Sequence, residues 1–211
     1  MLTLKKCRRI GLLGLLGLAA VAGGQSAYAG PAWTLDHPVN FRNSSWSFGD
    51  SFTVGARNIS VTALGAFDAD LDGFISTGGI PVGIFRESDG ALLASTMVLS
   101  ADSLTGHYRY NSIPSLTLLA NTVYRVVAVN ESDLYNIDTS TPNSVDPLIT
   151  WNRYGYCNTT ALTRCDAFQG TERTWMANFF IEGQQNVPEP GTLALFGVAL
   201  AGLGFARRRK Q

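Results

Sequence analysis

Short hydrophobic segments with a two-residue period constrain the fold of the central chain most strongly. In residues 58–67, NISVTALGAF, the side chains of Ile59, Val61 and Ala63 fall on one face of an extended strand. Comparable segments occur at residues 51–54, 80–85, 91–99, 115–119, 123–129, 148–151 and 173–181. No stretch between them has a convincing helical stripe, so the pattern predicts an all-β domain.

The connectors between these segments predict how the strands pair. Glu87-Ser88-Asp89-Gly90 lies between residues 80–85 and 91–99, and its Asp-Gly pair is a strong hairpin signal. The other connectors are rich in Gly, Asn, Ser and Thr. Together they predict an antiparallel β-sandwich, with jelly-roll and immunoglobulin-like topologies both open.

The N-terminus has the pattern of a secretory signal peptide. Residues 1–9 carry four cations and no acidic residue, residues 10–24 form an uncharged Leu-rich stretch, and Ala27-Tyr28-Ala29 gives a small-x-small cleavage pattern. We therefore expect residues 1–29 to form a signal helix that signal peptidase removes after Ala29.

The neutral overall charge conceals an acidic central domain. Four of the 16 Lys and Arg lie in the predicted signal and four at the C-terminus, so residues 30–186 hold 8 arginines against 15 acidic residues, a balance of −7. This charge argues against nucleic acid or an anionic membrane surface as a partner. A negative charge is compatible with cations or neutral glycans as partners, or it serves only to keep the domain soluble.

Two cysteines remain after the signal peptide, which takes Cys7 with it. Cys157 and Cys165 would lie in a compartment that permits oxidation, so they predict a disulfide. A metal pair is the alternative, but His37 and His107 are distant in the sequence.

An Asp-rich stretch, FDADLDGFIST, resembles the first half of a calcium loop. The carboxylates of Asp68, Asp70 and Asp72 and the carbonyl of Phe74 are the candidate ligands for Ca²⁺, the one cofactor that the sequence suggests. The twelfth position is Gly79 rather than a bidentate Glu. The alternative is a polar hairpin loop whose carboxylates accept hydrogen bonds from their own backbone.

Aromatic residues beside the cysteine pair are candidates for glycan binding. Trp151, Tyr154 and Tyr156 in WNRYGY would present flat faces to sugar rings. The alternative is that Trp151 fills the core and the tyrosines cover its rim.

An enzymatic function is not expected. Gly49-Asp50-Ser51 resembles the nucleophile block of GDSL-type esterases, but no histidine follows His107 and the predicted scaffold is not α/β. Hydrolysis of a matrix glycan is the third functional hypothesis. It would need a pair of carboxylates, and no segment of the sequence identifies such a pair.

The C-terminus joins Pro188-Glu189-Pro190, an apolar segment at residues 192–206 and a basic cluster formed by Arg207, Arg208, Arg209 and Lys210. This arrangement resembles the PEP-CTERM sorting signal of Gram-negative bacteria. The resemblance implies export across the inner membrane, transient anchoring, recognition and cleavage by an exosortase, and a final place at the cell surface or in an exopolysaccharide matrix. Similar tails are sometimes labelled as the C-terminal domain of ice-binding proteins, but the middle of this chain lacks a regular Thr-x-Thr ladder.

The length of the apolar segment agrees with a temporary anchor. Its 15 residues span about 22 Å as a helix, short of the roughly 30 Å hydrocarbon core. The terminal cations would stay cytoplasmic as a stop-transfer signal. The predicted organisation is a signal peptide (1–29), a β-sandwich ectodomain (30–182), a linker (183–187) and a sorting signal with a short transmembrane helix (188–211). The expected function is a non-enzymatic role in the extracellular polysaccharide layer, or carbohydrate binding.

Overall fold

The computed structural model describes residues 30–36, 38–137, 144–167 and 173–182, and these residues contain strands but no helix. The predicted signal helix, linker and transmembrane helix lie outside the described residues. The strands are β1 (Gly30–Pro31), β2 (Trp33–Thr34), β3 (Asn40–Phe41), β4 (Ser47–Val54), β5 (Ile59–Phe67), β6 (Ile80–Arg86), β7 (Leu92–Val98), β8 (Ser103–Thr105), β9 (Tyr108–Leu118), β10 (Val123–Val129), β11 (Tyr135–Asn136), β12 (Ser144–Val145), β13 (Ile149–Cys157) and β14 (Ala177–Ile181).

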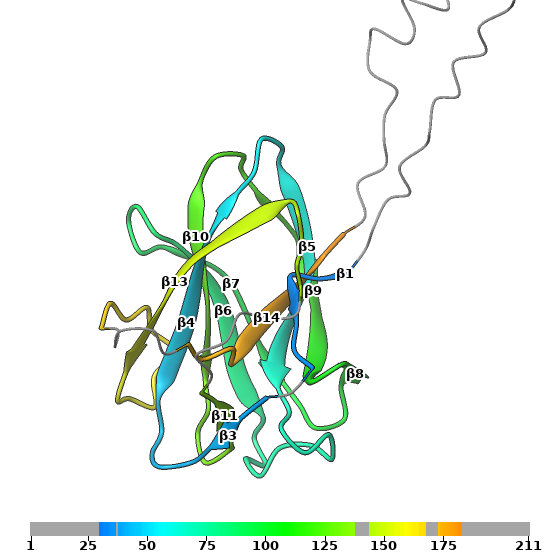
Figure 1. The fold of residues 1–211 in the computed structure, drawn as a ribbon, viewed down its shortest axis with the longest axis vertical. Coiled ribbons are helices and arrows are strands. Elements are labelled where there is room, and N and C mark those ends of the chain that lie inside the picture. The colour runs from blue at the N-terminus through cyan, green and yellow to red at the C-terminus, as the bar shows by residue number, and fades with distance from the viewer. Residues whose placement is uncertain (1–29, 37, 138–143, 168–172, 183–211) are drawn as a thin grey trace, which may run out of the picture.

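Two five-stranded antiparallel sheets form the layers of the domain (Figure 1). Their strand orders are β1-β14-β5-β9-β8 and β13-β4-β10-β6-β7, and two short ladders, β11-β3 and β12-β2, lie beside them. The predicted all-β, antiparallel architecture is confirmed, and the two layers share one hydrophobic core in the manner of a β-sandwich.

Strict alternation of side chains builds this core. On β10, Tyr124, Val126 and Ala128 point inward and are buried. On β4, which pairs with β10, the inward positions include Phe52, whose ring stacks on Phe179 of the opposite sheet with centroids 4.7 Å apart. The two-residue period read from the sequence is thus the period of the two inner faces.

One strand is longer than its hydrophobic pattern predicts. β9 begins at Tyr108, whereas the sequence predicts a strand only at residues 115–119. Pro114 interrupts the pattern, but the register between β5 and β9 shifts there, from Val61 opposite Leu116 to Ala63 opposite Ser112. A β-bulge accommodates the proline, which has no N–H to contribute to a regular ladder.

A carboxyl group lies in the core at the second inward position of β4, between Phe48 and Phe52. Asp50 is fully buried, and its Oδ1 accepts a hydrogen bond of 3.0 Å from Trp151 Nε1. Burial raises the pKa of Asp50 from 3.8 to about 8, against the smaller opposing effects of the Trp151 hydrogen bond and the charges of Arg125 and Arg173. At neutral pH, Asp50 is therefore mostly a neutral acid.

We predict that Asp50→Asn stabilises the domain increasingly toward alkaline pH. Between pH values of about 4 and about 8 the native state keeps a proton that the unfolded chain has released, so wild-type stability falls as the pH rises. The variant has no such titration. Urea denaturation should give an unfolding free energy above that of the wild type by on the order of a few kcal/mol at about pH 8, and a much smaller difference at about pH 4.

The matched control is Asp36→Asn, because Asp36 is exposed. Its stability profile should run parallel to that of the wild type. A pH-independent difference between Asp50→Asn and the wild type would contradict the buried neutral acid.

Candidate functional site

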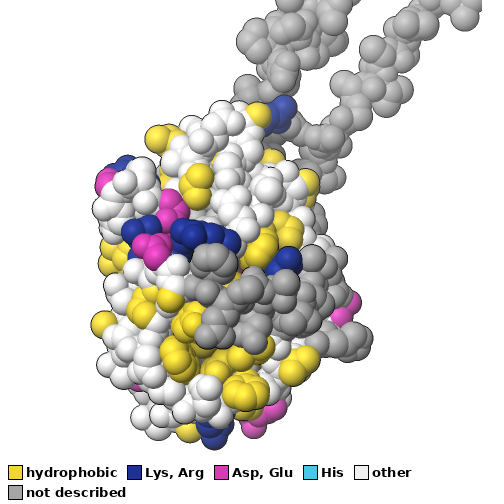
Figure 2. All heavy atoms as spheres, turned by 60° about the vertical axis from the view of Figure 1, so that its left-hand side comes forward, with side chains coloured by type: hydrophobic (Ala, Val, Ile, Leu, Met, Phe, Trp, Pro, Cys, Tyr) yellow, Lys and Arg dark blue, Asp and Glu magenta, His cyan; other side chains and the backbone are white. Residues whose placement is uncertain are grey.

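Aromatic side chains surround a pocket of 240 Å³ beside the inner face of the β13-β4 edge. We call it the aromatic pocket. Its lining consists of Asn43, Trp46, Phe48, Tyr135, Ile137, Tyr154, Tyr156 and Thr174. Figure 2 shows hydrophobic side chains gathered on the side of the molecule that lies to the left in Figure 1, next to a group of basic and acidic side chains.

The strand register brings the rings of the pocket together. β13 pairs with β4 so that Tyr156 lies opposite Phe48 and Tyr154 lies opposite Asp50. Because Tyr154 and Tyr156 are two residues apart, both point to the same face, and their rings stack at 6.0 Å with an interplanar angle of 13°. Trp46 meets Tyr156 edge to face at 5.6 Å.

Asn43 fixes two of the aromatic side chains. Its Oδ1 accepts hydrogen bonds from Trp46 Nε1 at 2.7 Å and from the Tyr135 hydroxyl at 2.8 Å. The Tyr135 ring also packs on Phe48 with centroids 4.6 Å apart. The walls of the pocket are therefore held before any ligand arrives, which reduces the ordering cost of binding.

One polar group of the pocket has no hydrogen-bond partner within the described part of the chain. Thr174 is only 2% exposed, and its Oγ1 is buried and unsatisfied. A buried hydroxyl without a partner is uncommon because it loses its bonds to water without replacement. The residue belongs to the lining of the pocket, next to the space that a ligand or a water would occupy.

The structure separates the three aromatic residues that the sequence singles out. Tyr154 and Tyr156 line the pocket, but Trp151 does not. The Trp151 ring packs on Trp175 with centroids 5.4 Å apart, its Nε1 binds Asp50, and the guanidinium of Arg173 lies 4.3 Å from the ring centroid. Trp151 thus packs against the hydrophobic core instead of lining the pocket.

Sequence reasoning missed the other half of the pocket. Trp46 directly precedes β4, Phe48 belongs to β4, Tyr135 belongs to β11, and Thr174 lies in the segment before β14. The two-residue spacing of Trp46 and Phe48 in SSWSF could have indicated that both rings lie on the same face of a strand. Nothing in the sequence places Tyr135 or Thr174 beside them.

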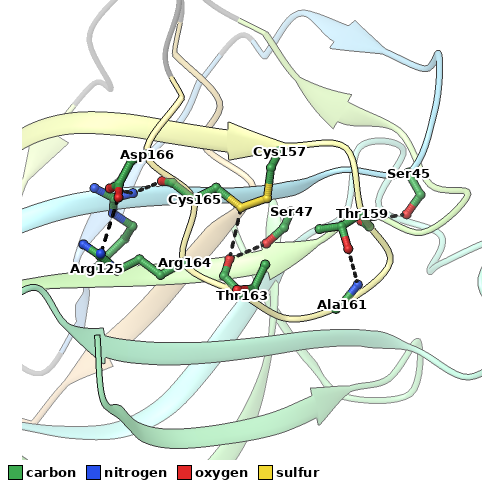
Figure 3. The surroundings of a disulfide bond; sticks show 10 residues. All are labelled: Ser45, Ser47, Arg125, Cys157, Thr159, Ala161, Thr163, Arg164, Cys165 and Asp166. Carbon is green, nitrogen blue, oxygen red and sulfur yellow. Dashed lines mark hydrogen bonds and ion pairs between the residues drawn. A yellow bond between two sulfur atoms is a disulfide. The ribbon is translucent and has the colours of Figure 1, made fainter. Parts of the chain in front are cut away.

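The predicted disulfide is confirmed and borders the pocket. Cys157 and Cys165 are bonded, with their Cα atoms 5.6 Å apart. Figure 3 shows how the loop between them lies on the sheet, where Ser47 Oγ donates to the Thr163 carbonyl at 2.8 Å. Just outside the disulfide, the Tyr156 N–H donates to the Ala167 carbonyl at 2.8 Å, which fixes the backbone of a pocket residue.

A buried arginine lies under this loop, on the outer face of the sheet. Arg125 donates to the Cys165 carbonyl, and its Nε lies 2.5 Å from Glu87 Oε1. Burial lowers the pKa of Arg125, and Glu87 opposes that shift. Gly155 makes this arrangement possible, because a side chain there would collide with the Cys165 carbonyl and with Arg125. Arg164 also pairs with Glu87, at 2.6 Å.

The structure brings three of the four predicted calcium ligands to one pocket and gives the fourth, Asp68, an arginine as partner. Asp68 is buried and its Oδ2 lies 2.6 Å from Arg109 Nε, while the same oxygen accepts the Gly73 N–H at 3.1 Å. Asp70, Asp72 and Phe74 line a pocket of 220 Å³ whose described lining does not include Asp68. The Phe74 carbonyl lies 3.5 Å from Ser100 Oγ. The described residues contain no group of three metal-binding side chains. Calcium binding stays a prediction, to be tested by melting curves with calcium and with chelator.

We predict that replacing both cysteines by serine lowers the unfolding free energy by about 2–3 kcal/mol, the value expected for closing so short a loop. Chemical denaturation of the oxidised wild type and of the Cys157→Ser/Cys165→Ser variant measures it. The wild type after reduction is the matched control and should unfold like the variant. Equal stability of all three forms would show that the bond does not constrain the unfolded chain.

The comparisons with known proteins concern only the C-terminal end. No curated protein matches the chain. Within the described residues no helix has the length and apolarity needed to cross a membrane. Residues 186–210, which lie outside the described part, match the family model of the PEP-CTERM protein-sorting motif. The chain therefore ends in a PEP-CTERM sorting motif.

Proposed function

We propose that the central domain is an exported, surface-sorted glycan-binding protein that associates with the extracellular polysaccharide matrix. The observation that carries this proposal is the aromatic pocket, in which the stacked Tyr154 and Tyr156 and the adjacent Trp46 surround an unsatisfied Thr174 hydroxyl. The sorting motif supplies the route, since it implies export and processing by an exosortase.

The chemistry of the lining suits a sugar. Aromatic faces pack against the C–H groups of a pyranose ring and remove apolar area from water. A few fixed polar groups then orient the ligand. The pocket offers both, with the rings of Trp46 and Tyr156 as aromatic surfaces and the hydroxyl of Thr174 as a polar partner.

Binding rather than catalysis agrees with the use of the acidic side chains. Asp68 pairs with Arg109, Glu87 with Arg125, and Asp89 with Arg86 at 2.7 Å. These carboxylates have structural partners instead of facing the aromatic pocket, whose described lining contains no carboxylate. A glycosidase needs two such groups flanking the scissile bond. We therefore place the hydrolase hypothesis below the binding one.

For the topology, we propose a jelly roll rather than an immunoglobulin-like sandwich. The chain crosses repeatedly between sheets, from β4 to β5, from β5 to β6, from β9 to β10 and from β13 to β14. Such interleaving of two Greek keys is typical of jelly rolls. It also supports the glycan proposal, because jelly rolls occur among lectin domains.

We predict that Trp46→Ala and Tyr156→Ala each weaken glycan binding by about tenfold or more, because each removes an aromatic face worth on the order of 1 kcal/mol or more. A glycan array identifies a ligand, and calorimetric titration measures the affinities. Phe180→Ala is the matched control. Its ring is half-buried like that of Tyr156 but packs on Tyr110 in the other sheet.

The control should bind like the wild type. Equal loss in all three variants would point to general destabilisation, and unchanged binding in the two pocket variants would reject the pocket as the site.

We predict that the protein isolated from its native host lacks Arg207 to Lys210, because the exosortase that reads the motif removes the tail. Mass spectrometry of the intact protein checks both ends, and the N-terminus should begin at Gly30. Deletion of residues 188–190 should leave the cations in place and keep the protein in the inner membrane. A mature wild-type protein that retains the four cations would overturn the sorting proposal.

A further inference from the structure

We infer that the aromatic pocket accepts one neutral sugar unit at the end of a glycan chain, and that Thr174 selects this unit through one of its hydroxyl groups. The inference rests on the proposed function and adds the class of ligand. Three properties of the pocket carry it: its size, the absence of charged side chains from its described lining, and the unsatisfied Thr174 Oγ1.

The size of the pocket limits the ligand to a single ring. Its volume is 240 Å³, below the range of about 300–1,000 Å³ typical of sites for larger organic ligands. Its described lining includes residues of β4, β13 and β11, and one end of a glycan chain would enter between them. A terminal residue can enter such a pocket, whereas an internal residue would need two exits.

The charge of the surroundings favours a neutral unit. The described lining contains no Lys, Arg, Asp or Glu. Arg173, which directly precedes Thr174, is engaged by the Trp151 ring. A uronic acid or a sulfated sugar would lose its hydration among aromatic rings without gaining a counter-ion. Residues 30–186 also carry more acidic than basic side chains, so the domain as a whole repels an anionic sugar.

Thr174 gives the pocket its polar selectivity. Its Oγ1 is buried and unpaired within the described residues, so a ligand hydroxyl that reaches it gains a hydrogen bond and relieves an existing deficit. A site built to bind a hydroxyl discriminates strongly against an analogue that lacks it, because the protein group is then left unpaired in the complex. Asn43 has a different role, since its carbonyl oxygen already serves Trp46 and Tyr135.

The test uses the mature protein purified from its host and calorimetric titration with methyl glycosides of neutral hexoses, their uronic acid counterparts, and oligosaccharides that carry the best unit at the end or only internally. We expect a neutral glycoside to bind at least about tenfold more tightly than its uronic acid. The oligosaccharide with that unit at its end should bind with similar affinity. The oligosaccharide with the unit only inside should not bind.

Thr174→Val and Thr174→Ser separate a binding role from a structural one. Thr174→Val keeps the shape of the side chain but removes its hydroxyl, and should weaken binding by about tenfold. Thr174→Ser keeps the hydroxyl and should bind like the wild type. The Thr174→Val variant should also lose the preference for the parent sugar over its monodeoxy analogue, an effect that mere destabilisation does not produce.

The outcomes distinguish the two proposals. Tighter binding of uronic acids, affinity that increases with each added sugar unit, or unchanged binding by Thr174→Val overturns the inference and leaves the glycan-binding function standing. Failure of every glycan to bind, including polysaccharide from the host's own matrix, overturns both.

Discussion

The pairing of β13 with β4 is the interaction on which the rest of the domain depends. This register places Trp151 opposite Phe52, Tyr154 opposite Asp50 and Tyr156 opposite Phe48. An irregularity between Trp151 and Arg153 shifts the register, so that Trp151, Tyr154 and Tyr156 all lie opposite inward-facing positions of β4. Trp151 packs against the core, Tyr154 lies opposite the buried acid Asp50, and Tyr154 and Tyr156 line the pocket. A slip of one residue would turn all of these side chains to the outer face.

Contacts on the outer face of the same sheet fix the edge strand β13 in place. Arg125 lies beneath the disulfide loop and binds the Cys165 carbonyl and Glu87. A side chain at position 155 would collide with it, so this position needs glycine. The loop thus covers a buried charge and at the same time fixes the backbone of Tyr156 through Ala167. Because breaking a buried ion pair is costly, these contacts hold the disulfide loop against the sheet.

The sequence predicted what depends on local patterns. The strands at residues 58–67, 80–85 and 123–129, the hairpin at Asp89-Gly90 and the disulfide correspond closely to the structure. Long-range partners were not predictable. Arg109 lies 41 residues from Asp68 in the sequence, yet it takes the carboxylate that resembled a calcium ligand. The aromatic pocket was only half predicted, because its lining also depends on long-range partners. Tyr154 and Tyr156 belong to one strand, whereas β11, which carries Tyr135, is too short to give a periodic pattern.

The position of the chain ends relates the pocket to the sorting route. The described domain begins at Gly30, which pairs with Ile181 of β14, so the chain enters and leaves on neighbouring strands. In Figure 1 these ends leave on the right, whereas β3 and β11, beside the aromatic pocket, lie at the bottom. In the proposed surface-sorted protein, a tether at the C-terminal end would therefore attach away from the pocket. The pocket would then be accessible to glycans both before and after the tail is cleaved, and processing would change where the protein resides without changing what it binds.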